Sequence, residues 1–294
     1  EMSASLVGSE MCIRDSVEGD RWELFFSRDG FLSQYRVDGR ELLAEGAALR
    51  PQFWRAPTEN DLGAGLDARF GVWKSPVLKL TQFDAVTEEG VAVVTARYEM
   101  PQVKGVLTMT YRINGAGEVS VAEQLEAGDA EAPGMFRFGM TMAMPARYSE
   151  IVYYGRGAHE NYCDRLSSAD LGLYSQKVAD QYHDEYVRPQ ESGTKSDLRW
   201  WSVVDSSGSG LVILSEAPFS ASALPYATEA LDVTNFPPQQ HSGPLRSGDR
   251  TYVNFDLRQM GLGCINSWGE LPEDQYMIPY GDYTFRFLLR PTVK

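Results

Sequence analysis

The stretch VLTMTYRI, residues 106–113, alternates between two sets of positions. One set consists of large apolar side chains: Leu107, Met109, Tyr111 and Ile113. The other set is mainly polar: Val106, Thr108, Thr110 and Arg112. Successive side chains of a β-strand point to opposite faces, so this period of two predicts a strand with one buried face.

Most of the chain on either side of this stretch also has the sequence pattern of β-strands joined by turns. Residues 21–43 predict a strand, a turn at Asp29-Gly30, a second strand, a turn at Asp38-Gly39 and a short third strand. Further strands are predicted at 91–100, 118–125, 135–144, 199–205, 210–216, 252–259 and 283–290. No segment has the pattern of a long amphipathic helix. We therefore predict an all-β fold, a large antiparallel sandwich formed by one domain over residues 17–294.

Three long stretches interrupt this pattern, at residues 50–75, 155–197 and 260–282, and we predict that they are irregular. Long loops in a compact domain commonly carry function or lie against another surface. The search for a site therefore concentrates on them.

Charge and hydropathy narrow the classes of function. The chain has 294 residues and 43% hydrophobic residues, and 41 acidic against 27 basic side chains give a net charge of −14. Such an acidic surface repels phosphate backbones, which disfavours nucleic-acid binding. No run of about eighteen apolar residues is present, so no membrane span is predicted. Neutral polar ligands such as sugars remain compatible with the composition.

The first sixteen residues, EMSASLVGSEMCIRDS, have neither the basic nor the apolar region of a signal peptide. The part EMCIRDS can be back-translated into the transposon-end repeat of sequencing adapters. We therefore expect residues 1–16 to be non-native and the natural protein to continue upstream. The compartment, whether cytoplasm, periplasm or exterior, is left open.

Three pairs of carboxylates are candidates for glycoside hydrolysis, which needs two carboxyl groups roughly 5–10 Å apart. The pairs are Glu59 with Asp61, Glu160 with Asp164, and Glu185 with Glu191. An arginine lies near each of them in the sequence: Arg55, Arg165 and Arg188. We interpret these carboxylates as structural partners of the arginines rather than as a catalytic pair.

The histidines and cysteines indicate no metal site. His159, His183 and His241 lack the spacing of a zinc site, and Cys12, Cys163 and Cys264 lack a CxxC motif. His159 and Glu160 are adjacent and form the one tempting acid–base pair. A histidine that only satisfies hydrogen bonds in its loop is the competing interpretation. Neither a GxSxG elbow nor a phosphate-binding loop is found.

Aromatic residues give a stronger signal for sugar binding. The loop NSWGELPEDQYMIPYGDY, residues 266–283, places Trp268, Tyr276 and Tyr280 among polar and proline residues. Aromatic rings pack on the C–H faces of sugars while polar groups bind the hydroxyls. The consecutive Trp200 and Trp201 differ, because neighbours on a strand face opposite sides and at least one should be buried.

Four motifs occur in a fixed order: FWRAPTENDLG (53–63), GRGAHENYCDR (155–165), YVRPQESGTKSDLRW (186–200) and NSWGELP (266–272). GFLSQ (30–34) precedes them and YTFRFLL follows. Together they resemble the C-terminal domain, also called the small chain or domain 5, of the large bacterial β-galactosidases of glycoside hydrolase family 2. The resemblance covers roughly residues 17–293. One departure is Ala158, where the family commonly has proline.

This resemblance implies a galactose-mutarotase-like β-supersandwich. It also implies that the catalytic glutamates and the magnesium and sodium sites lie on an upstream (β/α)₈ barrel, so that this chain alone has no catalytic residue and no cofactor and is inactive. The whole enzyme would hydrolyse terminal non-reducing β-D-galactose residues, such as that of lactose, with retention. The family's aglycone-stacking tryptophan corresponds to Trp268. Implied partners are a β-galactoside, the upstream barrel and sandwich domains, and further copies in a homo-oligomer.

Two other functions remain open at this point. One is a stand-alone carbohydrate-binding module that uses Trp268, Tyr276 and Tyr280 as its platform. The other is an aldose mutarotase or epimerase, which would need His159 and Glu160 together in a cleft.

Overall fold

The computed structural model describes residues 3–5, 13–128, 131–233, 245–263, 266 and 269–294, and their regular secondary structure is mainly antiparallel strands. The strands are β1 (Ser3–Ser5), β2 (Ile13–Glu18), β3 (Trp22–Ser27), β4 (Leu32–Val37), β5 (Arg40–Glu41), β6 (Arg50–Gln52), β7 (Lys79–Glu88), β8 (Val91–Met100), β9 (Gly105–Ile113), β10 (Val119–Glu126), β11 (Arg137–Pro145), β12 (Glu150–Gly157), β13 (Asp170–Lys177), β14 (Lys195–Val204), β15 (Gly210–Leu224), β16 (Arg250–Gln259) and β17 (Tyr283–Thr292). The helices are α1 (Glu59–Gly63), α2 (Leu66–Arg69) and α3 (Thr228–Leu231), with 3₁₀ turns η1 (Gly71–Trp73), η2 (Leu166–Ser168), η3 (Val178–Asp180) and η4 (Asp274–Tyr276).

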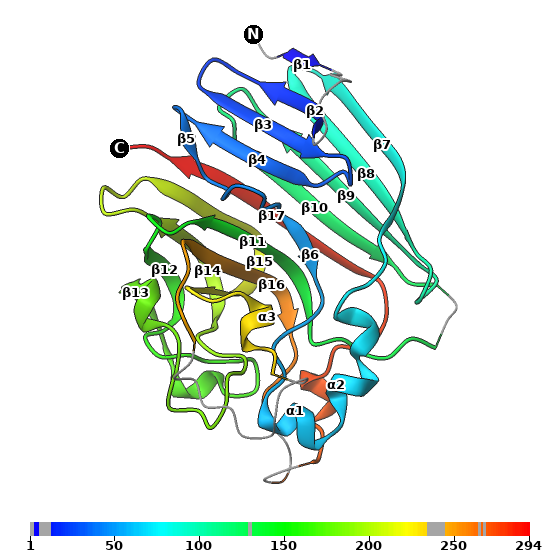
Figure 1. Ribbon diagram of the computed structural model, residues 1–294, viewed down its shortest axis with the longest axis vertical. Coiled ribbons are helices and arrows are strands. Elements are labelled where there is room, and N and C mark those ends of the chain that lie inside the picture. The colour runs from blue at the N-terminus through cyan, green and yellow to red at the C-terminus, as the bar shows by residue number, and fades with distance from the viewer. Residues whose placement is uncertain (1–2, 6–12, 129–130, 234–244, 264–265, 267–268) are drawn as a thin grey trace.

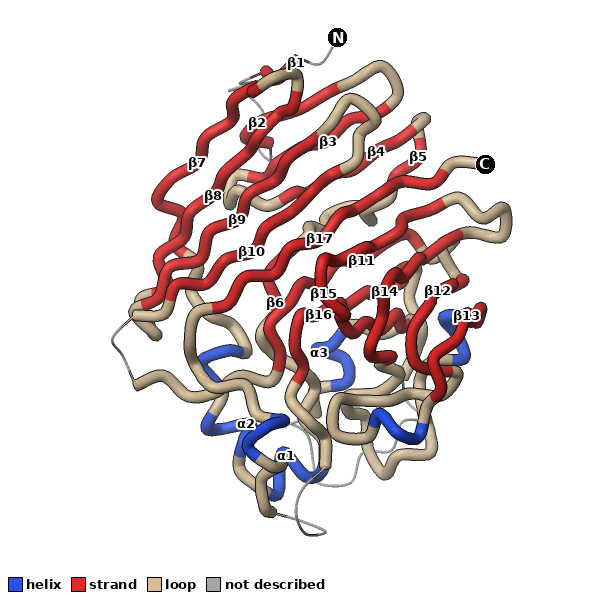
Figure 2. Tube along the Cα trace, turned by 180° about the vertical axis from the view of Figure 1, so that it is seen from behind, coloured by secondary structure: helices blue, strands red, loops and turns tan. Residues whose placement is uncertain are grey.

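Two sheets build the sandwich. The smaller sheet has the order β1-β2-β3-β4-β5, and the larger has twelve strands with the main path β13-β12-β14-β15-β17-β10-β9-β8-β7. Figure 2 shows β7, β8, β9, β10 and β17 running side by side across the back of the molecule. The smaller sheet lies over this part of the larger one (Figure 1).

The larger sheet branches at β15. Residues 210–215 of β15 pair with β17, whereas residues 220–224 pair with β16. β16 continues the branch to β11, and β11 pairs with β6. β15 thus pairs with two different strands along its length. The loops at the ends of β11 and β16 lie in the lower part of Figure 1.

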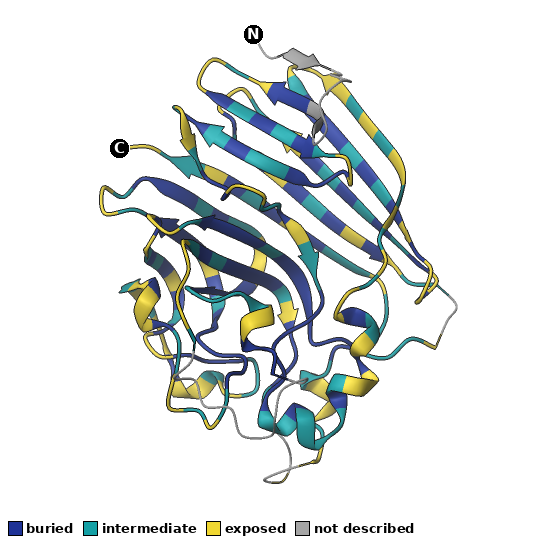
Figure 3. Ribbon diagram, in the orientation of Figure 1, coloured by how far each residue is buried: buried dark blue, intermediate teal, exposed yellow. Residues whose placement is uncertain are grey.

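Burial between the two sheets confirms the strand with one buried face that was predicted at residues 106–113. Leu107, Met109, Tyr111 and Ile113 are all fully buried. Phe26 of β3 packs edge-on against Tyr111 with ring centroids 5.1 Å apart, and the Tyr35 hydroxyl donates to the Gly117 carbonyl at 2.5 Å. Figure 3 shows alternating burial on β9 and nearly continuous burial along β11 and along residues 219–224 of β15. The all-β prediction is confirmed. Among the described residues, the longest helix is α1, with five residues.

The prediction of an irregular stretch at 155–197 was wrong in part, because β13 lies within it and pairs with β12. β13 is an edge strand on which most residues are exposed, and Leu173 is 68% exposed. An edge strand with so little buried surface carries a weak apolar alternation, which explains why the pattern missed it.

The N-terminal segment enters the smaller sheet. β2 begins at Ile13, within the segment expected to be non-native, and Val17 pairs with Leu24 of β3. The origin of residues 1–16 stays a prediction. No helix in the described part of the chain is long and apolar enough to cross a membrane.

Candidate functional site

The loop that begins FWRAPTEND is anchored to the sandwich by its two aromatic residues. Phe53 is 1% exposed and packs against Trp73 with ring centroids 5.4 Å apart. Trp54 packs edge-on against Phe136 and donates its indole N–H to Asp232 Oδ2 at 2.8 Å. Both side chains therefore fix the loop to the core.

An ion pair and a helix cap hold the next residues. Arg55 is fully buried and donates to both carboxylate oxygens of Asp61, at 3.0 and 2.7 Å. Asp61 also accepts from the Thr58 backbone N–H, and Thr58 Oγ1 accepts from the Asp61 N–H, a capping box that starts α1. The bidentate geometry and complete burial make Arg55–Asp61 a structural pair.

Arg55, which precedes α1, and Asn60 of α1 bind the segment that follows β16. Arg55 donates to the carbonyls of Met260 at 2.5 Å and Gly261 at 3.0 Å, and Asn60 Nδ2 donates to the Leu262 carbonyl at 3.0 Å. Sequence-distant residues 55–61 and 260–262 thus lie side by side.

Residues of the loop after β12 also bind residues 259–263. Asp164 Oδ2 accepts from the Gly263 N–H at 2.6 Å, and the Cys163 thiol donates to the Gln259 carbonyl at 3.2 Å. Four side chains bind residues 259–263 directly, and Asp61 orients one of them, Arg55; we call these five the loop clamp: Arg55, Asn60, Asp61, Cys163 and Asp164. Two sequence motifs converge in it, directly before the loop that contains Trp268.

Glu160 joins the second and third motifs. Its carboxylate is 7% exposed and accepts from Arg165 at 2.6 Å, from the Gly193 N–H at 2.8 Å and from the Tyr186 hydroxyl. Asn161 Oδ1 likewise accepts from the Ser196 N–H at 3.1 Å. With its oxygens occupied by protein donors, Glu160 serves here as the anchor of two loops.

Four of the six candidate carboxylates form ion pairs with arginines: Glu59, Asp61, Glu160 and Glu191. The predicted arginines all pair, Arg55 with Asp61, Arg165 with Glu160 and Arg188 with Glu59 at 2.5 Å. The pair Glu185 and Glu191 does not converge on one arginine, because Glu191 accepts from Arg137.

The histidines do not assemble a site in the described residues. His159 is exposed and lies 3.3 Å from Ser168 Oγ, while the neighbouring Glu160 faces the opposite, buried side. His183 Nε2 lies 3.7 Å from Glu160. Among the described residues, no group of three or more His, Cys, Asp or Glu could hold a metal ion. His241, Cys12 and Cys264 lie outside the described residues.

Tyr276 and Tyr280, two residues of the predicted aromatic platform, have different surroundings in the structure. Tyr280 is a structural residue, because its hydroxyl accepts from the Gly128 N–H and donates to the Val103 carbonyl at 2.7 Å while its ring packs on Trp73. Tyr276 is half-buried and lines a pocket. Trp268 lies outside the described residues. Trp201 is fully buried, as expected for one of the two consecutive tryptophans.

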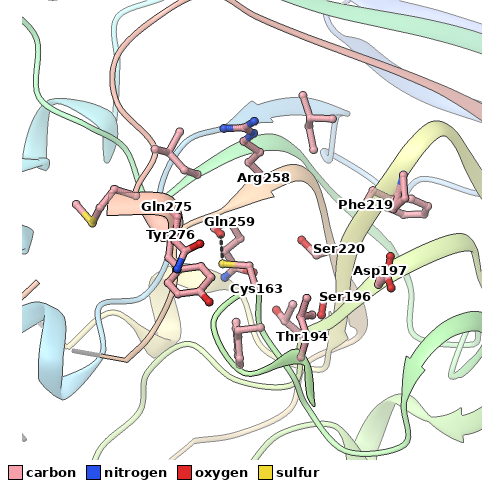
Figure 4. A pocket seen from close by; sticks show the side chains of 16 residues that line it. Cys163, Thr194, Ser196, Asp197, Phe219, Ser220, Arg258, Gln259, Gln275 and Tyr276 are labelled. Carbon is pink, nitrogen blue, oxygen red and sulfur yellow. Dashed lines mark hydrogen bonds between the residues drawn. The ribbon is translucent and has the colours of Figure 1, made fainter. Parts of the chain in front are cut away.

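The pocket lined by Tyr276 has a volume of about 340 Å³. Its walls come from residues 162–166, the first residues of β14, the middle of β15, the end of β16 and residues 275–278. Figure 4 shows Tyr276 and Gln275 on one side and Ser196 and Ser220 on the other, with Gln259 and Cys163 between them. The pocket therefore shares Cys163 with the loop clamp.

A buried polar cluster next to this pocket escaped the sequence analysis. Arg137 is 1% exposed, donates to Glu191 at 2.7 Å and lies 3.6 Å from Asp256. Burial raises the pKa of Asp256 to about 7, although Arg137 opposes the shift. Burial also raises the pKa of Glu123 well above its usual range, and the charge of Asp256 adds to it.

A signal for these residues was present in the sequence. Glu123 occupies the apolar series of its strand, with Val119, Val121 and Leu125. Arg137 stands in the otherwise apolar run MFRFGM. A charge at a position whose period predicts burial marks a polar group inside the core.

A comparison with known families decides the assignment. The profile of the family described as "Beta galactosidase small chain" matches residues 18–289. This chain belongs to the β-galactosidase small-chain family. The clamp residues and the pocket all lie within the matched range.

Curated relatives are several times longer than this small-chain domain. It is similar to the β-galactosidase of Priestia megaterium (strain DSM 319 / IMG 1521), with 32% identity over 272 residues, 91% of this chain and 25% of that protein. It is also similar to the β-galactosidase of Lactobacillus delbrueckii subsp. bulgaricus, with 30% identity over 266 residues, 89% of this chain and 25% of that protein. The chain thus spans about a quarter of the length of these relatives.

Solved structures confirm the fold. The small-chain domain is similar to galactose 1-epimerase from Lactobacillus acidophilus NCFM, with a TM-score of 0.50 and 10% identity over 99% of both chains. A second neighbour is the GH36 α-galactosidase AgaB from Geobacillus stearothermophilus, with a TM-score of 0.50 and 9% identity over 99% of this chain and 41% of that one. At these identities the likeness concerns the galactose-mutarotase-like β-sandwich alone.

Proposed function

We propose that this domain forms one wall of the substrate cleft of a retaining β-galactosidase whose catalytic carboxylates lie on other domains. The enzyme would cleave terminal β-D-galactose residues, such as that of lactose, in two displacements. In this role Trp268 stacks on the aglycone sugar and the domain takes no direct part in bond cleavage.

The loop clamp is the observation that carries the proposal. Arg55, Asn60 and Asp164 fix the backbone of residues 260–263 through hydrogen bonds of 2.5 to 3.0 Å. Trp268 follows this segment by five residues. A side chain that orients a sugar must be held by a rigid support, and a fully bonded backbone provides one.

The ion pairs support a non-catalytic role for the chain. The predicted candidate carboxylates Glu59, Asp61 and Glu160 each accept from an arginine. A glycosidase needs one free carboxylate and one free carboxylic acid beside the same bond. On this proposal the catalytic pair, and the magnesium and sodium ions, belong to a barrel domain of the same enzyme, and the enzyme assembles from several copies.

The test is the substitution Trp268→Ala in a complete β-galactosidase that contains this domain. Loss of one stacking ring is expected to raise KM for lactose about fivefold, as an aromatic contact of roughly 1 kcal/mol implies. Hydrolysis of an activated nitrophenyl galactoside, whose rate depends less on the aglycone contact, should change by less than about twofold. Steady-state kinetics with both substrates measure the difference.

Trp200→Ala is the matched control, because Trp200 is a half-buried tryptophan on β14. It should leave the ratio of the two activities unchanged. Lactose kinetics that are unaltered by Trp268→Ala would refute the aglycone role.

A further inference from the structure

We propose that strand β13, a free edge of the larger sheet, is an interface at which two copies of this chain pair edge to edge about a two-fold axis. The paired strands join the larger sheets of the two copies into one continuous sheet. This proposal does not rest on the cleft-forming role of Trp268, because the residues that carry it lie on β12 and β13.

β13 exposes apolar side chains at the margin of the sheet, where Figures 1 and 2 both place it. Leu173 is 68% exposed, more than any other large apolar side chain among the described residues. Leu171 is 46% exposed, and Tyr154, which lies opposite Leu173 on β12, is 42% exposed. Residues two apart on a strand share a face, and so do directly opposed residues, so these three side chains form one patch.

The backbone of β13 also has hydrogen-bonding groups that turn outward. Just beyond the strand, the Val178 N–H donates to the Ser149 carbonyl at 2.9 Å. Hydrogen-bonded and non-hydrogen-bonded pairs alternate along an antiparallel ladder, and β12 and β13 pair without a register shift, so the even-numbered residues of β13 face β12. The odd-numbered ones turn their N–H and C=O groups away from the sheet: Leu171, Leu173, Ser175 and Lys177. Among the described residues, no strand pairs with this side of β13.

The opposite margin of the same sheet, β7, shows how an edge is protected from pairing. β7 carries Lys79, Asp84 and Glu88 and has a bulge between Leu80 and Gln82. Charges, prolines and bulges of this kind keep edge strands from joining other strands. Between its first and last residues β13 has only uncharged side chains, and it contains neither a proline nor a bulge. β13 therefore has the features of an edge that another strand covers.

The charges of β13 indicate that a second copy is the strand that covers it. β13 begins with Asp170 and ends with Lys177. Antiparallel pairing of two copies brings the acidic end of each strand beside the basic end of the other, so opposite charges approach at both ends. The strand itself carries no net charge, so two copies can approach here although each chain as a whole carries −14.

Full overlap of the outward backbone groups sets the register. Residues that bond across an antiparallel ladder lie directly opposite each other, so the two-fold axis passes at Tyr174. Leu171 then lies opposite Lys177 of the partner subunit, whose aliphatic stem covers it. Leu173 lies opposite Ser175 of the partner subunit. The exposed apolar patches of the two copies meet at the axis in this register.

The test is sedimentation velocity of the 294-residue chain between about 5 and 500 μM. One strand-to-strand contact is smaller than a stable dimer interface, so we expect a dissociation constant of about 10–100 μM. The chain should be a monomer at the lowest concentration and mainly a dimer at the highest. The amides of residues 170–177 should exchange with solvent more slowly in the concentrated sample, because pairing covers the outward N–H groups.

Two substitutions on β13 should weaken the dimer at least about tenfold. Leu173→Lys gathers four ammonium groups on one face of the paired strands, two at position 173 and two of Lys177, and these repel one another. Ser175→Pro removes one outward N–H from each copy. Both side chains are exposed and the Ser175 N–H points away from β12, so both variants should keep the fold of the parent.

Val86→Lys is the matched control. Val86 is 48% exposed on β7, so this variant adds the same charge at the margin that is protected from pairing. It should leave the dissociation constant unchanged. Weakening equal to that of Leu173→Lys would mean that net charge, not β13, controls the association, and would contradict the proposal.

Three further results would overturn the proposal. The first is a monomer at every concentration, which would leave the edge of β13 to a segment of another domain. The second is a dimer whose affinity neither Leu173→Lys nor Ser175→Pro changes. The third is a dimer in which the amides of residues 170–177 exchange as fast as they do in the monomer.

Discussion

Among the residues whose burial the structure describes, the two most buried arginines have very different surroundings. Arg55, with no exposed surface, makes four hydrogen bonds, two to Asp61 and one each to the carbonyls of Met260 and Gly261. Arg137, 1% exposed, makes one hydrogen bond, to Glu191, and lies 3.6 Å from Asp256. Its Nε and Nη1 atoms make no hydrogen bond within the protein.

This difference separates a fully bonded structural pair from an incompletely bonded polar cluster in the core. A buried charge whose nitrogens all make hydrogen bonds holds the backbone around it, as Arg55 holds residues 260 and 261. A buried charge with free donors is costly unless water or a bound molecule completes its bonds. Arg137 lies opposite Gln259, whose own amide is unsatisfied, so incomplete bonding extends to the wall of the pocket.

Arg55→Met should have the largest effect on stability. It would leave the carboxylate of Asp61 buried without its partner and would free the carbonyls of residues 260 and 261. Removal of one member of a buried ion pair costs about 3–5 kcal/mol of the free energy of unfolding. Urea denaturation of the chain, followed by tryptophan fluorescence, measures the loss.

Arg21→Met is the matched control for that substitution. Arg21 makes the same bidentate contact, to Asp38 with both bonds at 2.6 Å, but its side chain is 73% exposed. Exposed pairs contribute little because water competes for both charges. Equal destabilisation by the two substitutions would show that burial is not what makes the Arg55 pair important.

Arg137→Met should have a smaller effect, roughly 1.5–3 kcal/mol, because a single charge-assisted hydrogen bond is lost. Its cost should also depend on pH. Arg137 lowers the pKa of Asp256, so in the variant Asp256 stays protonated to a higher pH and the penalty shrinks as the pH falls. Denaturation at pH 5 and pH 8 measures this change, and a penalty that is the same at both pH values would contradict the electrostatic account.

Most of the fold could be predicted from the sequence, because burial on one face of a strand leaves a period of two. The prediction for 91–100 coincides with β8, and those for 252–259 and 283–290 fall within β16 and β17. β13 and the branch at β15 could not be predicted. An exposed edge strand lacks the period, and the choice of pairing partners along β15 depends on contacts between distant residues.

The site was less predictable than the fold. The pairing of Arg55 with Asp61 could be predicted, because they lie six residues apart in one loop. The convergence of that loop with residues 260–263 and Asp164 could not, since the partners are separated by 99 to 206 residues. Tyr276 and Tyr280 looked alike in the sequence, and only the packing of Tyr280 on Trp73 distinguishes them.

Asp256→Asn is the most subtle test of the incompletely bonded region. Burial raises the pKa of Asp256 from its ordinary value of 3.8 to about 7, so the folded state binds this proton more tightly than the unfolded state. The parent chain therefore loses stability as the pH rises from the unfolded to the folded pKa, whereas asparagine has no proton to lose. The stability of the variant relative to the parent should rise by about 1 kcal/mol per pH unit between roughly pH 5 and pH 6.5.

Asp38→Asn gives the opposite sign and serves as the control for this pH dependence. The hydrogen bond from Arg21 lowers the pKa of Asp38, so its contribution to stability is present at neutral pH and is lost as the pH falls through the acid range. Parallel stability curves for the parent and Asp256→Asn would mean that Asp256 titrates normally in the folded chain. Water or another partner would then already complete its bonds, and the contrast between the surroundings of Arg137 and those of Arg55 would be smaller than the protein contacts indicate.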